Sequence, residues 1–158
     1  MTTGPGAWAE NYLILQRKGQ LFPAITVAAH RLRRLPVWRD RAPIDPAPLF
    51  DAIEDAVVQA TFFCNEALNA ALEAVFGAAR SLVDGVRTIQ DTSRPGFGGT
   101  VHDQHRADDD AARQRLDHAI AAFVAAARND LRIDGAWRGI EHAEPISPAD
   151  DRRVCRRD

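Results

Sequence analysis

The chain has 158 residues, enough for one domain with a substantial core, and its 20 basic and 22 acidic side chains leave a formal net charge of −2. This balance gives no overall positive charge that would favour nucleic acid. Cys64 and Cys155 are too few and too far apart for a disulfide framework or a zinc site.

The sequence also bears on the location and the source of the protein. The longest apolar runs fall well short of the roughly 18 residues that span a bilayer, and the first residues lack the pattern of a secretory signal. We therefore expect a soluble, cytoplasmic protein that makes no membrane contact. Ala is abundant and Lys18 is the only lysine among the basic residues. This bias is typical of a high-GC bacterial genome.

Two short helices are predicted in the first 35 residues. Trp8, Tyr12 and Leu15 share one face of a helix over residues 7–18, and Gly19 is a natural C-terminal stop. A second helix is expected to start at Pro23 and to end before Pro36.

Basic residues gather around a tryptophan where the second helix ends. The cluster consists of Arg31, Arg33, Arg34, Trp38, Arg39 and Arg41. Arginine contacts to phosphates combined with base stacking on an aromatic ring are how proteins hold single-stranded nucleic acid. This cluster is therefore a candidate nucleic-acid site. Residues 1–41 carry seven basic and two acidic groups, whereas residues 42–79 carry six acidic groups and no Lys or Arg. The acidic stretch thus offers these arginines a partner within the chain.

A proline-rich connector over residues 36–48 leads into the longest helical pattern of the chain, residues 46–91. Apolar residues recur there at steps of three and four, and the predicted helix is either unbroken or broken near Gly77. An unbroken helix would be roughly 70 Å long, more than a compact domain of this size spans. We therefore expect part of its apolar seam to contact another subunit. The candidate interface residues are Val75, Leu82, Val86 and Ile89.

A Gly-rich loop over residues 92–104 precedes the last long helix, which is predicted to run from the acidic residues at 108–110 to about Arg132. His102 and His105 have the chemistry of metal ligands. A metal site needs rigid surroundings, however, and these histidines lie between the Gly-rich loop and the start of a helix, so no metal is predicted. Residues 1–145 are expected to form a single domain and residues 146–158 a charged tail.

The pattern as a whole predicts an all-α protein, an antiparallel bundle of about four main helices built on the long or kinked helix at 46–91. No strand pattern and no catalytic motif stands out, and no cofactor is predicted. The leading hypothesis is a non-catalytic helical module, a bacterial homo-oligomer or a subunit of a larger complex, with coiled-coil-like contacts to itself or to another protein. The alternative is a nucleic-acid-associated bundle, in a bacterial conflict or RNA-processing setting, that binds through the Arg/Trp cluster.

Overall fold

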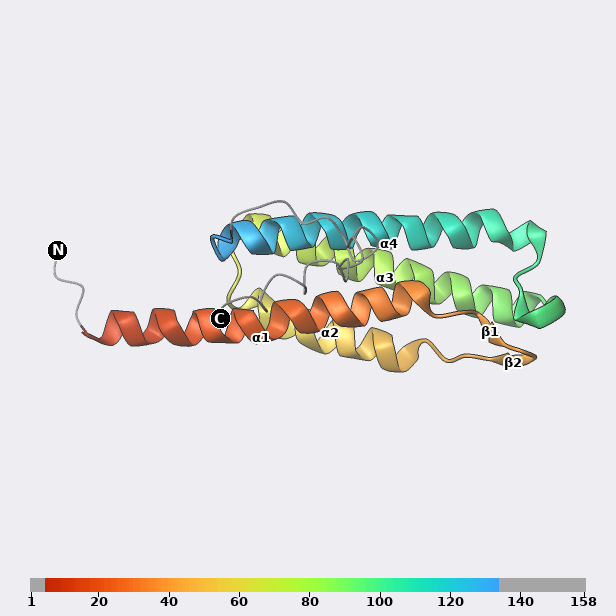
Figure 1. Ribbon diagram of the computed structural model, residues 1–158, viewed down its shortest axis with the longest axis horizontal. Coiled ribbons are helices and arrows are strands. Elements are labelled where there is room, and N and C mark those ends of the chain that lie inside the picture. Colours follow the sequence, from red (N-terminus) through yellow and green to blue (C-terminus); the bar gives the residue numbers. More distant parts are fainter. Residues whose placement is uncertain (1–4, 134–158) are drawn as a thin grey trace, which may run out of the picture.

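A computed structural model describes residues 5–133, which form four helices that run alternately in opposite directions (Figure 1). The helices are α1 (Pro5–Arg34), α2 (Ala47–Thr61), α3 (Glu66–Thr92) and α4 (Asp103–Asp130). α1 packs mainly on α2, α3 packs mainly on α4, and further contacts of α1 with α4 and of α2 with α3 close the bundle. The predicted all-α fold is confirmed.

The core lies along the axis of the bundle, where the apolar stripes of all four helices meet. Phe22 of α1 and Phe123 of α4 contact edge to face with ring centroids 5.6 Å apart, a geometry that the charge distribution of aromatic rings favours. The largest fully buried side chains include Ile25, Leu32, Ile53, Leu68, Leu72, Leu82, Leu116 and Ile120. Each helix thus contributes a stripe with the three-to-four residue period that burial of one helical face requires.

The break in the long helical pattern falls at residues 62–65, between α2 and α3, and not at Gly77. Asn65 begins α3, and its side-chain oxygen accepts a hydrogen bond from the backbone amide of Leu68 at 2.9 Å. Such a cap satisfies an amide that the first turn of a helix leaves unpaired. Gly77 and Gly85 lie inside α3, because burial of its apolar face outweighs the roughly 1 kcal/mol that each glycine costs a helix.

α1 is one helix of 30 residues, whereas two helices separated at Gly19 and Pro23 were predicted. Pro23 lacks an amide hydrogen, so the carbonyl of Gly19 loses its usual helical partner. Gly19 is exposed, which allows water to reach that carbonyl. Leu21, Phe22 and Ile25 around the proline are buried, and this burial holds the helix together across it.

The connector between α1 and α2 contains a small hairpin, in which β1 (Trp38–Arg39) pairs antiparallel with β2 (Ala42–Pro43). The loop between α3 and α4 forms the short 3₁₀ helix η1 (Phe97–Gly99), which packs against β1. Gly99 has a φ of 78°, and a Cβ there would lie 3.2 Å from the backbone nitrogen of Asp40. Only glycine fits this close approach of two backbones.

Gln90 of α3 fastens the connector to the bundle. Its Nε2 donates hydrogen bonds to the carbonyl oxygens of Val37 at 2.9 Å and of Ile44 at 2.8 Å, on either side of the hairpin. We expect Gln90→Leu to lower the free energy of unfolding by about 1–3 kcal/mol, because two part-buried carbonyls lose their donor. Urea unfolding measures this effect. Arg87→Leu, an exposed position one turn away on α3, is the matched control, and an equal loss in both variants would contradict the assigned role.

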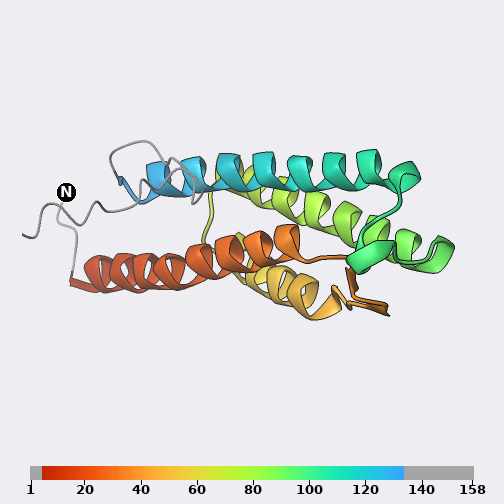
Figure 2. The same ribbon diagram turned by 45° about the vertical axis from the view of Figure 1, so that its right-hand side comes forward.

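Two ion pairs join α1 to α4 and fix how far the helices overlap. Lys18 Nζ lies 2.7 Å from Asp130 Oδ2, and Arg33 Nε lies 2.8 Å from Asp117 Oδ1. On the other side, the guanidinium of Arg17 donates to the side-chain oxygen of Gln59 near the end of α2. Lys18 and Arg17 therefore mark the level at which α4 and α2 end, and the part of α1 before them projects beyond the bundle (Figures 1 and 2).

The predicted domain boundary at 145 and the charged tail at 146–158 lie outside the described residues.

Candidate functional site

The most unusual surface of the described chain is the projecting start of α1, residues 5–16, which we call the overhang. At about 1.5 Å per residue, it extends the helix by roughly 18 Å past its neighbours. Trp8, Tyr12 and Leu15 lie on one face of it and are 71%, 67% and 51% exposed. Helix surface that faces water is usually polar, so large exposed apolar side chains make the overhang a candidate contact surface.

The end of α2 adds apolar surface beside the overhang. α1 and α2 run in opposite directions, and the Arg17–Gln59 hydrogen bond sets their register. Leu13 lies one turn before Arg17, and Phe62 follows Gln59 by three residues, so both lie on the outer side of that bond. Phe62 is 82% exposed and Leu13 is also exposed. The two helix ends therefore both expose apolar side chains at this end of the bundle, with Leu13 on the side of α1 that carries Arg17.

Exposed large apolar side chains of the described residues are concentrated at this end of the bundle. The group comprises Trp8, Tyr12, Leu13, Ile14, Leu15, Val58, Phe62 and Ile133. Within residues 5–133, the two other exposed side chains of this kind are Val27, in the second half of α1, and Phe97 in η1 at the opposite end. A random scatter of single apolar residues would be ordinary, whereas their concentration at one end makes this end a candidate contact surface.

The predicted interface residues on α3 lie elsewhere. Val75, Leu82, Val86 and Ile89 are at most 4% exposed and belong to the core of this single chain. The break between α2 and α3 explains the difference, because it folds the long seam into two helices that cover each other together with α1 and α4. In this fold these four side chains are therefore not open to a second subunit.

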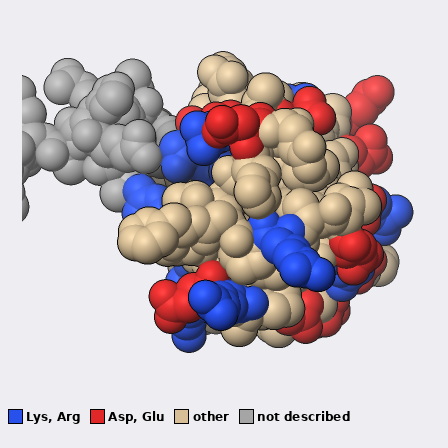
Figure 3. All heavy atoms as spheres, turned by 90° about the vertical axis from the view of Figure 1, so that its right-hand side faces the viewer, with Lys and Arg blue, Asp and Glu red and all other residues tan. Residues whose placement is uncertain are grey.

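The structure buries the aromatic member of the Arg/Trp cluster and pairs one of its arginines within the chain. Trp38 is 7% exposed and packs in the core, so its ring is not open to a base. Arg33 makes the ion pair with Asp117, while Arg31 and Arg34 lie at the end of α1 and Arg39 and Arg41 in the hairpin. At that end of the molecule, basic and acidic side chains alternate on the visible face (Figure 3). The nucleic-acid hypothesis thus loses the aromatic side chain on which it depended.

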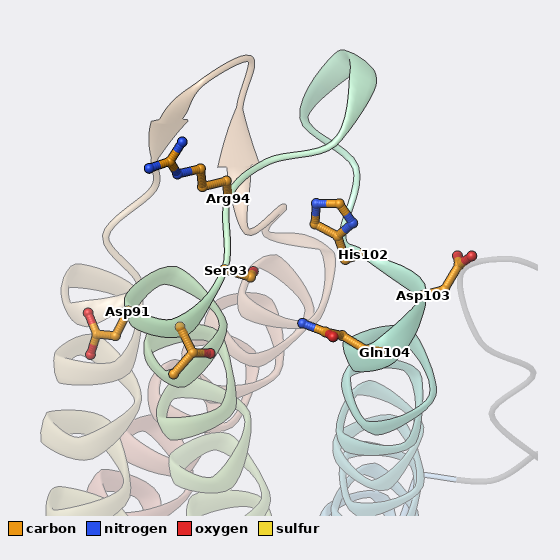
Figure 4. A pocket seen from close by; sticks show the side chains of 7 residues that line it. Asp91, Ser93, Arg94, His102, Asp103 and Gln104 are labelled. Atoms are coloured by element: carbon orange, nitrogen blue, oxygen red, sulfur yellow. The ribbon is translucent and has the colours of Figure 1, made fainter.

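His102 lies at the start of α4, beside a shallow polar hollow lined by residues 91–94 and 102–104. Asp91 and Asp103 point away from each other across this hollow, and Arg94 turns toward the hairpin (Figure 4). His105 lies in the first turn of α4, where its Nε2 is 3.1 Å from Nε2 of Gln104. Within residues 5–133, no three His, Cys, Asp or Glu side chains gather closely enough to hold a metal ion. The side chains of this hollow do not converge on a common point.

Cys64, in the link between α2 and α3, is half-buried near the same end as the overhang. Burial raises the pKa of its thiol, and nearby Asp130 adds to this rise while Lys18 opposes it. A raised pKa keeps the thiol protonated at neutral pH, and the protonated form is a poor nucleophile. Cys64 therefore resembles a packing residue more than a reactive centre.

Comparison of the chain with models of protein families, with curated proteins and with solved structures gives no significant match. Within residues 5–133, none of the helices combines the length and the apolar character of a membrane span.

The sequence identified the stripe of Trp8, Tyr12 and Leu15 but not its exposure. Exposure depends on where α2 and α4 end relative to α1, and the Arg17–Gln59 and Lys18–Asp130 contacts set this register. The end of α2 carries a signal in the sequence, since Asn65 is a typical first-turn cap.

Proposed function

We propose that this chain is a non-catalytic helical assembly module that associates through the apolar end of its bundle, in a homo-oligomer. The observation that carries the proposal is the overhang, a projecting stretch of helix whose large apolar side chains are more than half exposed at Trp8, Tyr12 and Leu15. Removing this apolar area from water favours association at about 25 cal/mol per Å² before the costs of binding are met.

The distribution of charge supports the same choice of surface. Lys18 is already paired with Asp130, and Arg17 bonds Gln20 and Gln59, so the two basic side chains at the base of the overhang are engaged within the chain, and Glu10 is the one charged residue of the overhang itself. Contact surfaces between subunits are depleted in charge at their centre and enriched in Trp and Tyr. The overhang has this composition, whereas the opposite end of the bundle mixes acidic and basic side chains (Figure 3).

Light scattering of the full-length chain over a range of micromolar concentrations tests the proposal. We expect the wild type to exceed its monomer mass of 17.4 kDa, and the variant carrying Tyr12→Asp and Leu15→Asp to remain a monomer. Burying these carboxylates in an apolar contact costs several kcal/mol, which raises the dissociation constant by orders of magnitude, beyond the micromolar concentrations used. The aspartates should leave folding intact because both positions are exposed.

The matched control is Val27→Asp, which adds a charge at an exposed apolar position of the same helix away from the overhang. Its mass should equal that of the wild type. A wild type that stays monomeric at the highest concentration overturns the proposal. A Tyr12→Asp/Leu15→Asp variant that assembles normally would show that the overhang is not the surface of association.

A further inference from the structure

We infer that the occupant of the overhang is the overhang of a second copy, lying antiparallel to it across a two-fold axis between Leu13 and Ile14. This inference rests on the proposed function and adds the partner, its direction and its register. The starting observation is the order of the residues along the stripe. Trp8, Tyr12, Leu15 and Gly19 follow one another at spacings of four, three and four. This order of spacings is the same read in either direction.

Such a stripe is self-complementary when two copies run in opposite directions. In a two-fold contact, residue i of one copy faces residue j of the other, and j faces i in turn. An axis midway between residues 13 and 14 pairs Trp8 with Gly19 and Tyr12 with Leu15. Alternating steps of three and four are also the spacing at which two helices pack side by side over several turns.

The sizes of the paired residues fit this arrangement. Trp8 is the largest side chain of the stripe, and it would face Gly19, which has none. A Cβ built at Gly19 meets no atom of the chain within 4 Å, so the space above this glycine is open. In a parallel pair, the same stripe would set Trp8 against Trp8 and Gly19 against Gly19. One layer would then be overfilled and another left empty, and both conditions disfavour packing.

The flanks of the stripe bring no like charges together. In the antiparallel register, Ala9 lies beside Gln16 of the second copy and Asn11 lies beside Lys18. The charged side chains Glu10 and Arg17 fall on the opposite face of the helix, because they are displaced by about half a turn from Trp8 and Leu15. The contact can therefore exclude water without leaving an unpaired charge inside it.

The area available is sufficient for a specific, reversible dimer. An aromatic side chain covers roughly 150–250 Å², and most of Trp8 and Tyr12 is exposed. With Leu15 and the flanking polar residues, two overhangs together would bury on the order of 1,000 Å², near the lower limit of specific interfaces. A dissociation constant in the micromolar range is the expectation for an interface of this size.

A size exchange between positions 8 and 19 tests the register. In the full-length chain, Gly19→Leu should raise the dimer dissociation constant by at least about tenfold, since the new side chain meets Trp8 of the second copy. Trp8→Gly should weaken the dimer similarly because it empties the same layer. The double variant Trp8→Gly/Gly19→Trp again sets one tryptophan against one glycine, and it should return the constant to within about threefold of the wild type.

Thermal unfolding separates this effect from damage to the fold. Gly19→Leu adds a better helix former at an open position, so the isolated chain should be at least as stable as the wild type. If Gly19→Leu raises the dimer dissociation constant while the single chain keeps or gains stability, damage to the fold cannot be the cause. If Gly19→Leu leaves the dissociation constant unchanged, or if the double variant is weaker than both single variants, the register is overturned.

Cross-linking tests the direction of the second copy. In full-length chains with Cys64 and Cys155 replaced by Ala, Ala9→Cys and Gln16→Cys leave the stripe intact and lie on the same flank. A mixture of the two variants should give a covalent dimer with a short bismaleimide, while Ala9→Cys alone should not, because its two copies would be roughly 13 Å apart along the axis. Equal cross-linking in both samples overturns the antiparallel arrangement. The light-scattering comparison of Tyr12→Asp/Leu15→Asp would still decide the proposed function separately.

Discussion

Leu82→Asp is expected to unfold the chain and not merely to alter its assembly. Leu82 is fully buried in α3, at the contact with α4, in the cluster that all four helices share. The substitution removes a packed side chain and brings a carboxylate into an apolar site. Loss of the leucine alone costs about 2–5 kcal/mol, and an unpaired buried charge adds several more. This sum approaches or exceeds the 5–15 kcal/mol that typically holds a domain folded.

Far-UV circular dichroism and urea unfolding measure this outcome. Leu82→Ala should remain folded, with a free energy of unfolding lower by about 2–5 kcal/mol, because it leaves a cavity but no charge. Val27→Asp is the matched control on the surface, where the same carboxylate stays hydrated. A folded Leu82→Asp chain with reduced mass in solution would contradict the core position and would restore the α3 seam as an interface.

The main difference between the predicted and the observed helices lies at residues 62–65, where the long helix is broken. The spacing of apolar residues predicted the helical faces of α2, α3 and α4 well, because burial of a helix face has a fixed period. It did not reveal the break, since Phe62, Phe63 and Cys64 continue an apolar pattern through the link. Gly77 was the expected break point, yet a glycine inside a helix costs only about 1 kcal/mol and packing on α4 overcomes it.

The same break decides which apolar side chains the fold leaves exposed. A helix unbroken over residues 46–91 would leave Val75 and Leu82 on a seam too long for one chain to cover. With the break, α3 turns back along α2, and the two helices bury each other's apolar faces. The exposed large apolar side chains are then found mainly on α1, which at 30 residues is twice as long as its neighbour α2 at 15. The sequence argument placed an apolar surface without a partner on residues 46–91. The structure instead exposes large apolar side chains on the overhang, because α2 and α4 end at the level of Arg17 and Lys18.

The second large effect is expected at Arg113 of α4, because its side chain hydrogen-bonds the backbone at the C-terminal end of α1. Its Nη1 donates to the carbonyl oxygens of Arg33 and, at 2.8 Å, Leu35, while its Nε donates to Asp109 Oδ2 at 2.8 Å. The carbonyls in the last turn of a helix have no partner within that helix. Both side chains of the ion pair are mostly buried, at 19% and 10% exposure, so water cannot easily replace the guanidinium.

We therefore expect Arg113→Met to lower the free energy of unfolding, measured in urea, by about 2–4 kcal/mol. Charge-assisted hydrogen bonds contribute about 1.5–3 kcal/mol each, and their loss is not additive.

The control is Arg106→Met. Arg106 pairs with Asp103 at 2.7 Å near the start of the same helix, but its side chain and that of Asp103 are 59% and 89% exposed. Exposed pairs contribute at most about 1 kcal/mol, so this variant should unfold close to the wild type. Adding Asp109→Asn to Arg113→Met should restore part of the loss, because the buried carboxylate then no longer lacks its cation. Equal losses in the Arg113 and Arg106 variants, or a further full loss on adding Asp109→Asn, would show that the end of α1 does not depend on this guanidinium.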